Sequence, residues 1–171
     1  ALKQIEAKNP SLENKEAVAH AVGVGAVIFH DLKNDRTNNF DFALEEVVQF
    51  EGETGPYVQY THARAMSILR KANHTVDTQA AFSLTDDDAW EVLKLIENYP
   101  NVVRFAEEKC EPSAIAKFVI NLAQAFNKYY AHTKVLVEDE AFNSRIALVQ
   151  TTASILKQGL ALLGVAAPDE M

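Results

Sequence analysis

The sequence has almost no cysteine and no long apolar run. Its 171 residues include a single cysteine, Cys110, so an internal disulfide framework is excluded and a reducing compartment is favoured. No apolar stretch approaches the roughly 18 residues that a membrane-spanning helix needs, and no signal peptide opens the chain. The first residues, Ala-Leu-Lys-Gln-Ile-Glu, are typical of the middle of a helix. We therefore expect a cytoplasmic protein without a membrane span, and a piece of a longer chain.

Positive charge is also in short supply. Sixteen Lys and Arg residues stand against 24 Asp and Glu residues, which gives a net charge of −8. Proteins draw much of their affinity for a phosphate backbone from Lys and Arg, which release counterions. An acidic chain is a poor general binder of nucleic acid, so any RNA contact should be local and led by shape. The 48% hydrophobic and 23% charged residues are ordinary for a globular protein and argue against disorder.

Strand patterns are scarce, and most of the chain has helical periodicity. Apolar residues recur at helical spacing in the segments 14–32, 56–72, 85–99, 102–105, 112–130 and 140–163. Phe40, Phe42 and Leu44 alternate, as in a short strand or an extended stretch, and residues 73–83 form a polar linker. We expect an all-α protein, with a helical bundle from about Pro56 onward and a smaller, mostly helical segment before it.

Several helix ends are also predicted. Pro56 suits the first position of a helix, where no backbone donor is needed. Thr85 is expected to cap the next helix, which should stop near Tyr99–Pro100. The longest helix should begin at Pro112–Ser113. The segment 140–163 is apolar on two sides, which predicts a helix at the centre of the bundle.

No motif indicates a catalytic or metal site within the chain. Gly23-Val24-Gly25 lacks the third glycine of a dinucleotide fingerprint and lies inside a helical pattern, which favours close helix packing or a weak point in the helix. The five histidines show no paired spacing of metal ligands. Cys110 lies among acidic residues, which disfavour its reactive thiolate. We predict no catalytic residue and no metal ligand in this chain.

One cluster suits RNA binding. Tyr57, Tyr60 and Arg64 fall at i, i+3 and i+7, so they share one face of their helix. Unstacked RNA bases are held by aromatic rings and arginine planes, which makes this face a candidate stacking platform. The alternative is that the tyrosines pack against a neighbouring segment and Arg64 pairs with a carboxylate. Tyr129 and Tyr130 are both open to a core or a surface role, and Arg145 suits a buried ion pair.

Several segments, in a fixed order, resemble the arginyl-tRNA synthetase family. The segment that links the catalytic domain of that family to its C-terminal helical domain is similar to Phe50-Glu-Gly-Glu-Thr-Gly-Pro-Tyr-Val-Gln-Tyr-Thr-His-Ala-Arg64. The other similar segments are Gly23-Val-Gly-Ala-Val-Ile-Phe-His-Asp-Leu-Lys-Asn-Asp-Arg36, Phe40-Asp-Phe42, Leu122-Ala-Gln-Ala-Phe-Asn-Lys-Tyr-Tyr130, Ser144-Arg-Ile-Ala-Leu-Val149 and the tail from Leu160 to Met171. The last three resemble a DALR anticodon-binding domain and the family's C-terminus.

The resemblance implies an architecture and a function. Residues 1–56 would be the end of a catalytic domain, and residues 57–171 a DALR helical bundle that holds the anticodon loop of arginine tRNA. The implied anticodon contacts are Tyr57, Tyr60, Arg64, Tyr130 and Met171, and Gln59 and His62 would support the junction between the domains.

The family charges arginine tRNA with arginine through an adenylate made from ATP, with Mg²⁺. Its ATP-binding motifs, His-x-Gly-His and the Lys-Met-Ser-Lys-type loop, are absent from this chain, so the chain alone should be inactive. The implied partners are arginine tRNA and the rest of the catalytic domain, in a monomer.

Two rival interpretations remain. One is an acidic helical module for protein interaction that has kept the fold without RNA binding. The other is the DALR domain of another class I synthetase. Inward-pointing Tyr57, Tyr60 and Arg64 would favour the first rival, and the Gly-Pro-Tyr-Val-Gln-Tyr stretch argues for arginine over other amino acids.

Overall fold

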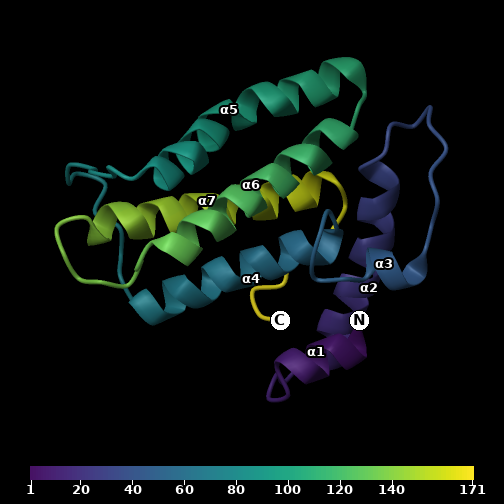
Figure 1. The fold of residues 1–171 in the computed structure, drawn as a ribbon, viewed down its shortest axis with the longest axis horizontal. Helices are drawn as coiled ribbons and strands as arrows, with labels where there is room; N and C mark the ends of the chain where they lie inside the picture. The colour runs from purple at the N-terminus through teal and green to yellow at the C-terminus, as the bar shows by residue number, and fades with distance from the viewer.

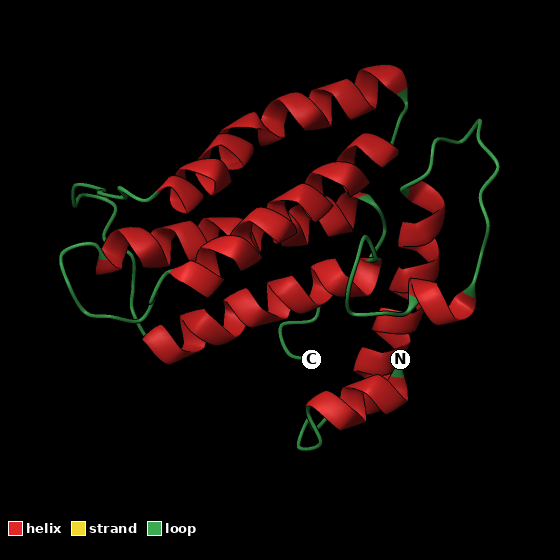
Figure 2. Cartoon of the chain, in the orientation of Figure 1, coloured by secondary structure: helices red, strands yellow, loops and turns green.

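The computed structural model describes the backbone of residues 1–171 and all side chains except those of Ala7 and Lys8. Its helices are α1 (Leu2–Lys8), α2 (Lys15–Leu32), α3 (Leu44–Val47), α4 (Gly55–Ala72), α5 (Asp87–Lys109), α6 (Ser113–His132) and α7 (Phe142–Leu162). Loops connect them, and the described residues contain no strand (Figure 2). The predicted all-α class is confirmed.

The four long helices α4 to α7 form a bundle, and α1 to α3 pack at one end of it (Figure 1). Helices α6 and α7 lie at the centre, because α6 contacts α4, α5 and α7, and α7 contacts α4, α5 and α6. The largest fully buried side chains of this core include Phe126, Tyr129, Ile146, Leu156 and Leu160. The central position predicted for the last helix is confirmed.

Helix α4 follows its predicted start and end. The Thr54 side chain accepts a hydrogen bond from the Tyr57 backbone N–H, and Pro56 occupies the first turn. Asn73 ends the helix in the left-handed conformation, with φ of 44°. This helix therefore has defined ends on both sides.

Helix α5 departs from the prediction in three ways. Its cap is Asp86, whose carboxylate accepts from the Ala89 N–H at 2.7 Å, and not Thr85. It runs without a break through Pro100, which we expected to end it. Pro100 itself is exposed, and Tyr99 beside it stacks on Phe118 of α6, which holds the helix in place. As a result α5, with 23 residues, is longer than α6, with 20, and the prediction that α6 is longest is wrong.

The segment before α4 docks through a close approach of backbones. A Cβ on Gly25 of α2 would lie 2.9 Å from Gln59 Nε2 and 2.9 Å from Val165 Cγ1, whereas a Cβ on Gly23 would meet nothing within 4 Å. Close packing, one of the two alternatives for this glycine pair, is therefore confirmed for Gly25. Residues 40–43, for which the sequence suggested a short strand or an extended stretch, form neither helix nor strand and lead into α3.

Two of the open assignments are resolved. Tyr129 is fully buried in the core, whereas Tyr130 remains 41% exposed. Arg145 is buried and forms an ion pair with Asp139 at 2.8 Å, and it also donates to the carbonyl of Val135 at 3.2 Å. The predicted buried ion pair is confirmed for the arginine, whereas the Asp139 side chain is half-exposed. The Arg145 guanidinium holds the pKa of the Asp139 carboxyl below its usual range.

Candidate nucleic-acid interface

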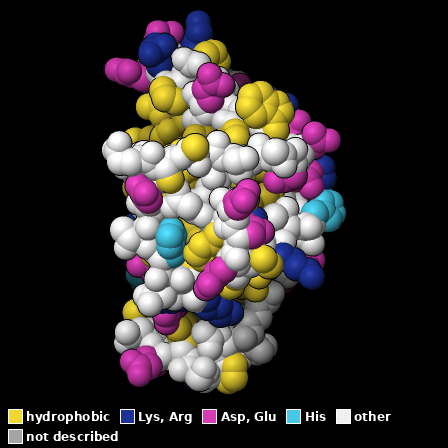
Figure 3. Space-filling model, turned by 90° about the vertical axis from the view of Figure 1, so that its left-hand side faces the viewer, with side chains coloured by type: hydrophobic (Ala, Val, Ile, Leu, Met, Phe, Trp, Pro, Cys, Tyr) yellow, Lys and Arg dark blue, Asp and Glu magenta, His cyan; other side chains and the backbone are white. Residues whose placement is uncertain are grey.

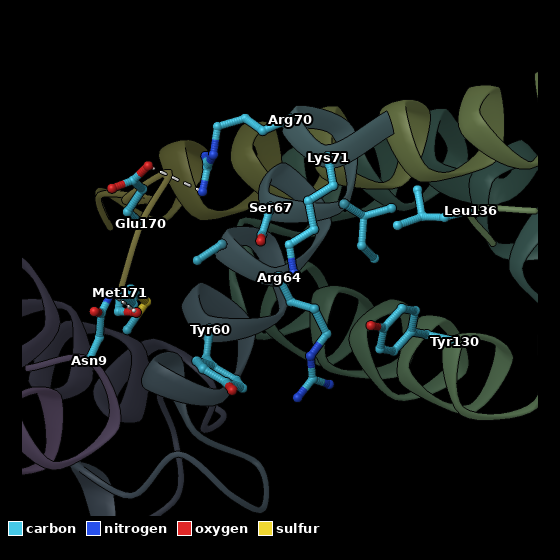
Figure 4. A pocket seen from close by; sticks show the side chains of 12 residues that line it. Asn9, Tyr60, Arg64, Ser67, Arg70, Lys71, Tyr130, Leu136, Glu170 and Met171 are labelled. Atoms are coloured by element: carbon cyan, nitrogen blue, oxygen red, sulfur yellow. Dashed lines mark hydrogen bonds and ion pairs between the residues drawn. The ribbon is translucent and has the colours of Figure 1, made fainter. Parts of the chain in front are cut away.

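A cavity of about 420 Å³ opens where α4, the end of α6 and the C-terminal tail meet (Figure 4). The residues that line it are Asn9, Tyr60, Ala63, Arg64, Ser67, Ile68, Arg70, Lys71, Tyr130, Leu136, Glu170 and Met171. Four of the seven residues proposed from the sequence, namely Tyr60, Arg64, Tyr130 and Met171, therefore lie around one cavity. The tail brings Met171 there from the far end of the chain.

Arg64 lies between two aromatic rings. Its guanidinium carbon is 4.9 Å from the centroid of the Tyr60 ring and 5.7 Å from that of Tyr130, within the range of cation–π attraction (Figure 4). Within the described part of the chain, no carboxylate forms an ion pair with Arg64. The part of the alternative in which Arg64 pairs with a carboxylate is therefore wrong, and no carboxylate among these residues neutralises the charge at the cavity. The part in which the tyrosines pack against neighbouring segments is confirmed, because Tyr57 packs against the bundle core and the Tyr60 ring lies 5.9 Å from that of Phe50.

The sequence analysis missed Asn127, a side chain on α6 that hydrogen-bonds to Arg64. Asn127 of α6 accepts a hydrogen bond from Arg64 Nη1 through Oδ1. Its Nδ2 donates to the Tyr57 hydroxyl at 3.0 Å and to Thr61 Oγ1 at 2.8 Å. Tyr57 is thus attached to this network and is not among the residues that line the cavity. Spacing could have placed Asn127 on the Tyr130 face of α6, three residues before it, but it could not have shown the partners on α4.

Gln59 and His62 connect α4 to segments far away in the sequence. Gln59 is fully buried, and its Nε2 donates to the carbonyls of Ala21 in α2 at 3.3 Å and of Ala166 in the tail at 2.7 Å. His62 Nδ1 lies 3.1 Å from the Pro168 carbonyl oxygen. A carbonyl oxygen only accepts, so Nδ1 carries the proton. Burial lowers the pKa of His62, so its ring is neutral near pH 7.

The C-terminal tail is held at its last residues as well. Arg70 donates to the Asp169 carbonyl at 3.2 Å and pairs with Glu170 at 3.2 Å, and Asn9 Nδ2 donates to the Met171 carbonyl at 3.3 Å. The tail is therefore attached to α4 along its length and to the segment that follows α1 at its end. This attachment places the Met171 side chain at the cavity.

The charge around the cavity differs from that of the whole chain. Arg64, Arg70 and Lys71 line it together with one acidic side chain, Glu170, which Arg70 pairs with. On the face shown in Figure 3, acidic and basic side chains are interspersed, with no continuous basic patch. Around the cavity, two aromatic rings and a few basic groups suit recognition of a few flipped-out bases by stacking.

No metal site accompanies this cavity in the described part of the chain. Among those residues, no group of three or more His, Cys, Asp or Glu side chains is arranged to hold a metal ion. None of the described helices combines the length and the apolar character needed to cross a membrane.

Two protein families match the chain, one after the other. Residues 58–171 match the DALR anticodon binding domain, and residues 1–44 match the catalytic domain of class I tRNA synthetases (R). These two matches bear out the order of motifs noted in the sequence.

Known proteins agree with both matches. The chain is 65% identical over 168 residues to arginine–tRNA ligase of Enterococcus faecalis and 60% identical to that of Streptococcus thermophilus, covering 98% of the chain. It spans 30% of the length of these relatives. Arginyl-tRNA synthetase of Thermus thermophilus superimposes with a TM-score of 0.92 at 36% identity, over 99% of this chain and 30% of that one. The corresponding protein of Plasmodium falciparum gives 0.88 at 25% identity, with the same coverage. The resemblance to arginyl-tRNA synthetases is confirmed, and the chain belongs to the family of the DALR anticodon binding domain.

Proposed function

We propose that this chain is the tRNA-binding part of an arginine–tRNA ligase, and that the cavity around Arg64 receives bases of the anticodon loop. The two matched families and the relatives named as arginine–tRNA ligases support this proposal. The complete ligase would join arginine to its tRNA with ATP and Mg²⁺, in the cytoplasm and as a monomer. The adenylate chemistry would take place outside these residues, so the chain alone is expected to be inactive.

One observation carries the proposal. An arginine that no carboxylate of the described residues neutralises lies between two tyrosine rings at the edge of an open cavity. Aromatic rings and arginine planes are the surfaces on which unstacked RNA bases are held. A base that enters here would meet the exposed Tyr130 ring, and Arg64 has further N–H donors for a base edge or a phosphate.

The remaining site residues take different parts in this proposal. Met171 lines the cavity and offers apolar contact to a base. Tyr57 supports the network below Arg64. Gln59 and His62 hold α2 and the tail against α4, which is a junction role between the proposed domains 1–56 and 57–171.

The rival proposal, an acidic module for protein interaction, is less well supported. It would be favoured by a face on which Tyr57, Tyr60 and Arg64 all point inward. Tyr60 and Arg64 instead line an open cavity, and the Arg64 guanidinium keeps its charge. A DALR domain of another class I synthetase is disfavoured because the compared relatives are arginine–tRNA ligases.

The test is binding of the chain to an arginine tRNA transcript beside a non-cognate tRNA, at low and moderate salt. The variant is Arg64→Ala, and its matched control is Arg104→Ala, which removes the same charge from an exposed position on α5. We expect cognate-selective binding that Arg64→Ala weakens by roughly 10- to 100-fold, because stacking and base-edge contacts are each worth about 1–3 kcal/mol. The control should bind as the unmodified chain does. Equal, weak binding to both tRNAs, unchanged in Arg64→Ala, would refute the proposal.

A further inference from the structure

We infer that Asn127 is a positioning residue for tRNA recognition, which fixes the Arg64 guanidinium between the two tyrosine rings while leaving its charge intact. The inference rests on the proposed function and adds a residue that no resemblance assigned. Asn127 lies on α6 and Arg64 on α4, so the contact crosses the interface between two helices. Asn127 itself is absent from the cavity lining, and it acts through Arg64.

The direction of the Asn127 amide is determined from both of its ends. The Thr61 hydroxyl donates its proton to the Tyr57 carbonyl at 2.9 Å, so Thr61 Oγ1 can only accept from Asn127. The amide nitrogen must therefore face Thr61. On the other end, a guanidinium has donors and no acceptor, so the amide oxygen must face Arg64. A flipped amide would set donor against donor at Arg64.

The network gives both donors and the oxygen of the Asn127 amide group a partner in one arrangement. Both of its N–H groups have an acceptor, and its oxygen accepts from Arg64. A satisfied network between two packed helices defines a single geometry. Arg64 thereby gains a third attachment besides the rings of Tyr60 and Tyr130, and its long side chain is ordered before RNA arrives.

The chemical type of the acceptor matters as much as its place. A carboxylate at this position would also hold Arg64, and it would cancel the charge that a phosphate or a base acceptor needs. An amide holds the guanidinium through one neutral oxygen. Because the chain has a net charge of −8, an arginine that no nearby carboxylate neutralises supplies the local positive charge that RNA binding needs.

A double-mutant cycle separates positioning from mere structure. Binding of an arginine tRNA transcript is measured for the whole chain, for Asn127→Ala, for Arg64→Ala and for the double variant, with Asn121→Ala on an exposed face of α6 as the control. We expect Asn127→Ala to weaken binding by about tenfold, the value of a hydrogen bond to a charged group. In the Arg64→Ala background the same substitution should change binding by less than about twofold, because the residue acts only through Arg64.

A second variant keeps the test decisive if removal of the amide disturbs folding. Asn127→Asp has nearly the same shape and still accepts from Arg64. The Tyr57 hydroxyl can donate to it, and the Thr61 hydroxyl can turn from the Tyr57 carbonyl to donate to it as well, so its thermal unfolding should stay close to that of the unmodified chain. Its tRNA binding should nevertheless weaken by about tenfold, with a salt dependence smaller by about one phosphate contact.

The outcomes distinguish this inference from the proposed function. Equal effects of Asn127→Ala in both backgrounds, or normal binding by Asn127→Asp, would overturn the inference and leave the role of Arg64 standing. Unchanged binding by Arg64→Ala would overturn the proposed function, and the inference with it. Weakening that disappears in the Arg64→Ala background supports both.

Discussion

Substitution of Gly25 by alanine probes the contact between α2 and the bundle. A methyl group at this position would lie 2.9 Å from Gln59 Nε2 and 2.9 Å from Val165 Cγ1. Ordinary contacts between such atoms are about 3.5–4.0 Å, so both neighbours must move by roughly half an ångström or more. Neither moves easily, because Val165 is buried and Gln59 is held by the Ala166 carbonyl at 2.7 Å.

The expected free-energy change has three contributions. Overpacking of a filled site costs about 1–3 kcal/mol. Weakening of the buried hydrogen bonds of Gln59 costs about 1 kcal/mol more. Alanine in a helix regains about 1 kcal/mol relative to glycine. The net expectation is a loss of about 2 kcal/mol in the free energy of unfolding, which corresponds to a fall of about 4–8 °C in Tm for a chain of this size.

Gly23→Ala is the matched control in the same helix. Nothing lies within 4 Å of a Cβ at this position, so only the helix propensity contributes. We expect an increase of about 0.5–1 kcal/mol in stability and a rise of about 1–4 °C in Tm. Thermal unfolding followed by circular dichroism measures both variants. If Gly25→Ala proves as stable as Gly23→Ala, α2 does not dock on Gln59 and the tail as described.

The remaining predictions concern stability and pH. Arg145→Ala should lower the free energy of unfolding, measured in urea, by about 3 kcal/mol, because the Val135 and Val137 carbonyls lose the buried guanidinium that donates to them. An effect below about 1 kcal/mol would contradict the buried role of Arg145. Asp86→Ala should cost about 1 kcal/mol as a lost helix cap, and Thr85→Ala much less. Burial lowers the pKa of His62 below 6.5, so the unfolded chain takes up a proton at a higher pH than the folded chain does. The free energy of unfolding should therefore be highest above about pH 6.5. It should fall as the pH drops from there through the lowered pKa of the folded chain. His62→Gln should reduce this slope, and His20→Gln, at an exposed position, should leave it unchanged.

Local signals in the sequence were enough to locate most helices. Pro56 at the start of α4 and the polar residues after Ala72 act on their immediate neighbours, so a one-dimensional pattern contains the information. The same holds for α7, whose two apolar sides imply neighbours on more than one face. Tyr60 and Arg64 could be grouped because four residues along a helix bring side chains to the same face.

The errors arose where tertiary contacts override a local signal. Pro100 is a strong helix breaker, yet Tyr99 stacks on Phe118 and keeps α5 continuous. Thr85 and Asp86 are both good caps, and only the backbone geometry of the structure chooses between them. Asn127 escaped notice because its partners lie 63 to 70 residues away, and no periodicity within α6 reports a partner on α4.

Helix α4 combines three roles on three of its faces, which explains how an acidic chain can present a local site for RNA. Val58 and Ala65 are fully buried in the core and fix the rotation of the helix. Gln59 faces α2 and the tail, so the tail is attached before any ligand binds. The Arg64 side chain lies on the remaining face, at the cavity, where no carboxylate of the described residues neutralises it. Because the rotation of α4 is set by its core face, the position of the guanidinium depends on packing that the net charge of −8 does not influence. Overall charge therefore limits the strength of nonspecific binding to nucleic acid, while the geometry of one helix determines where a base can be held.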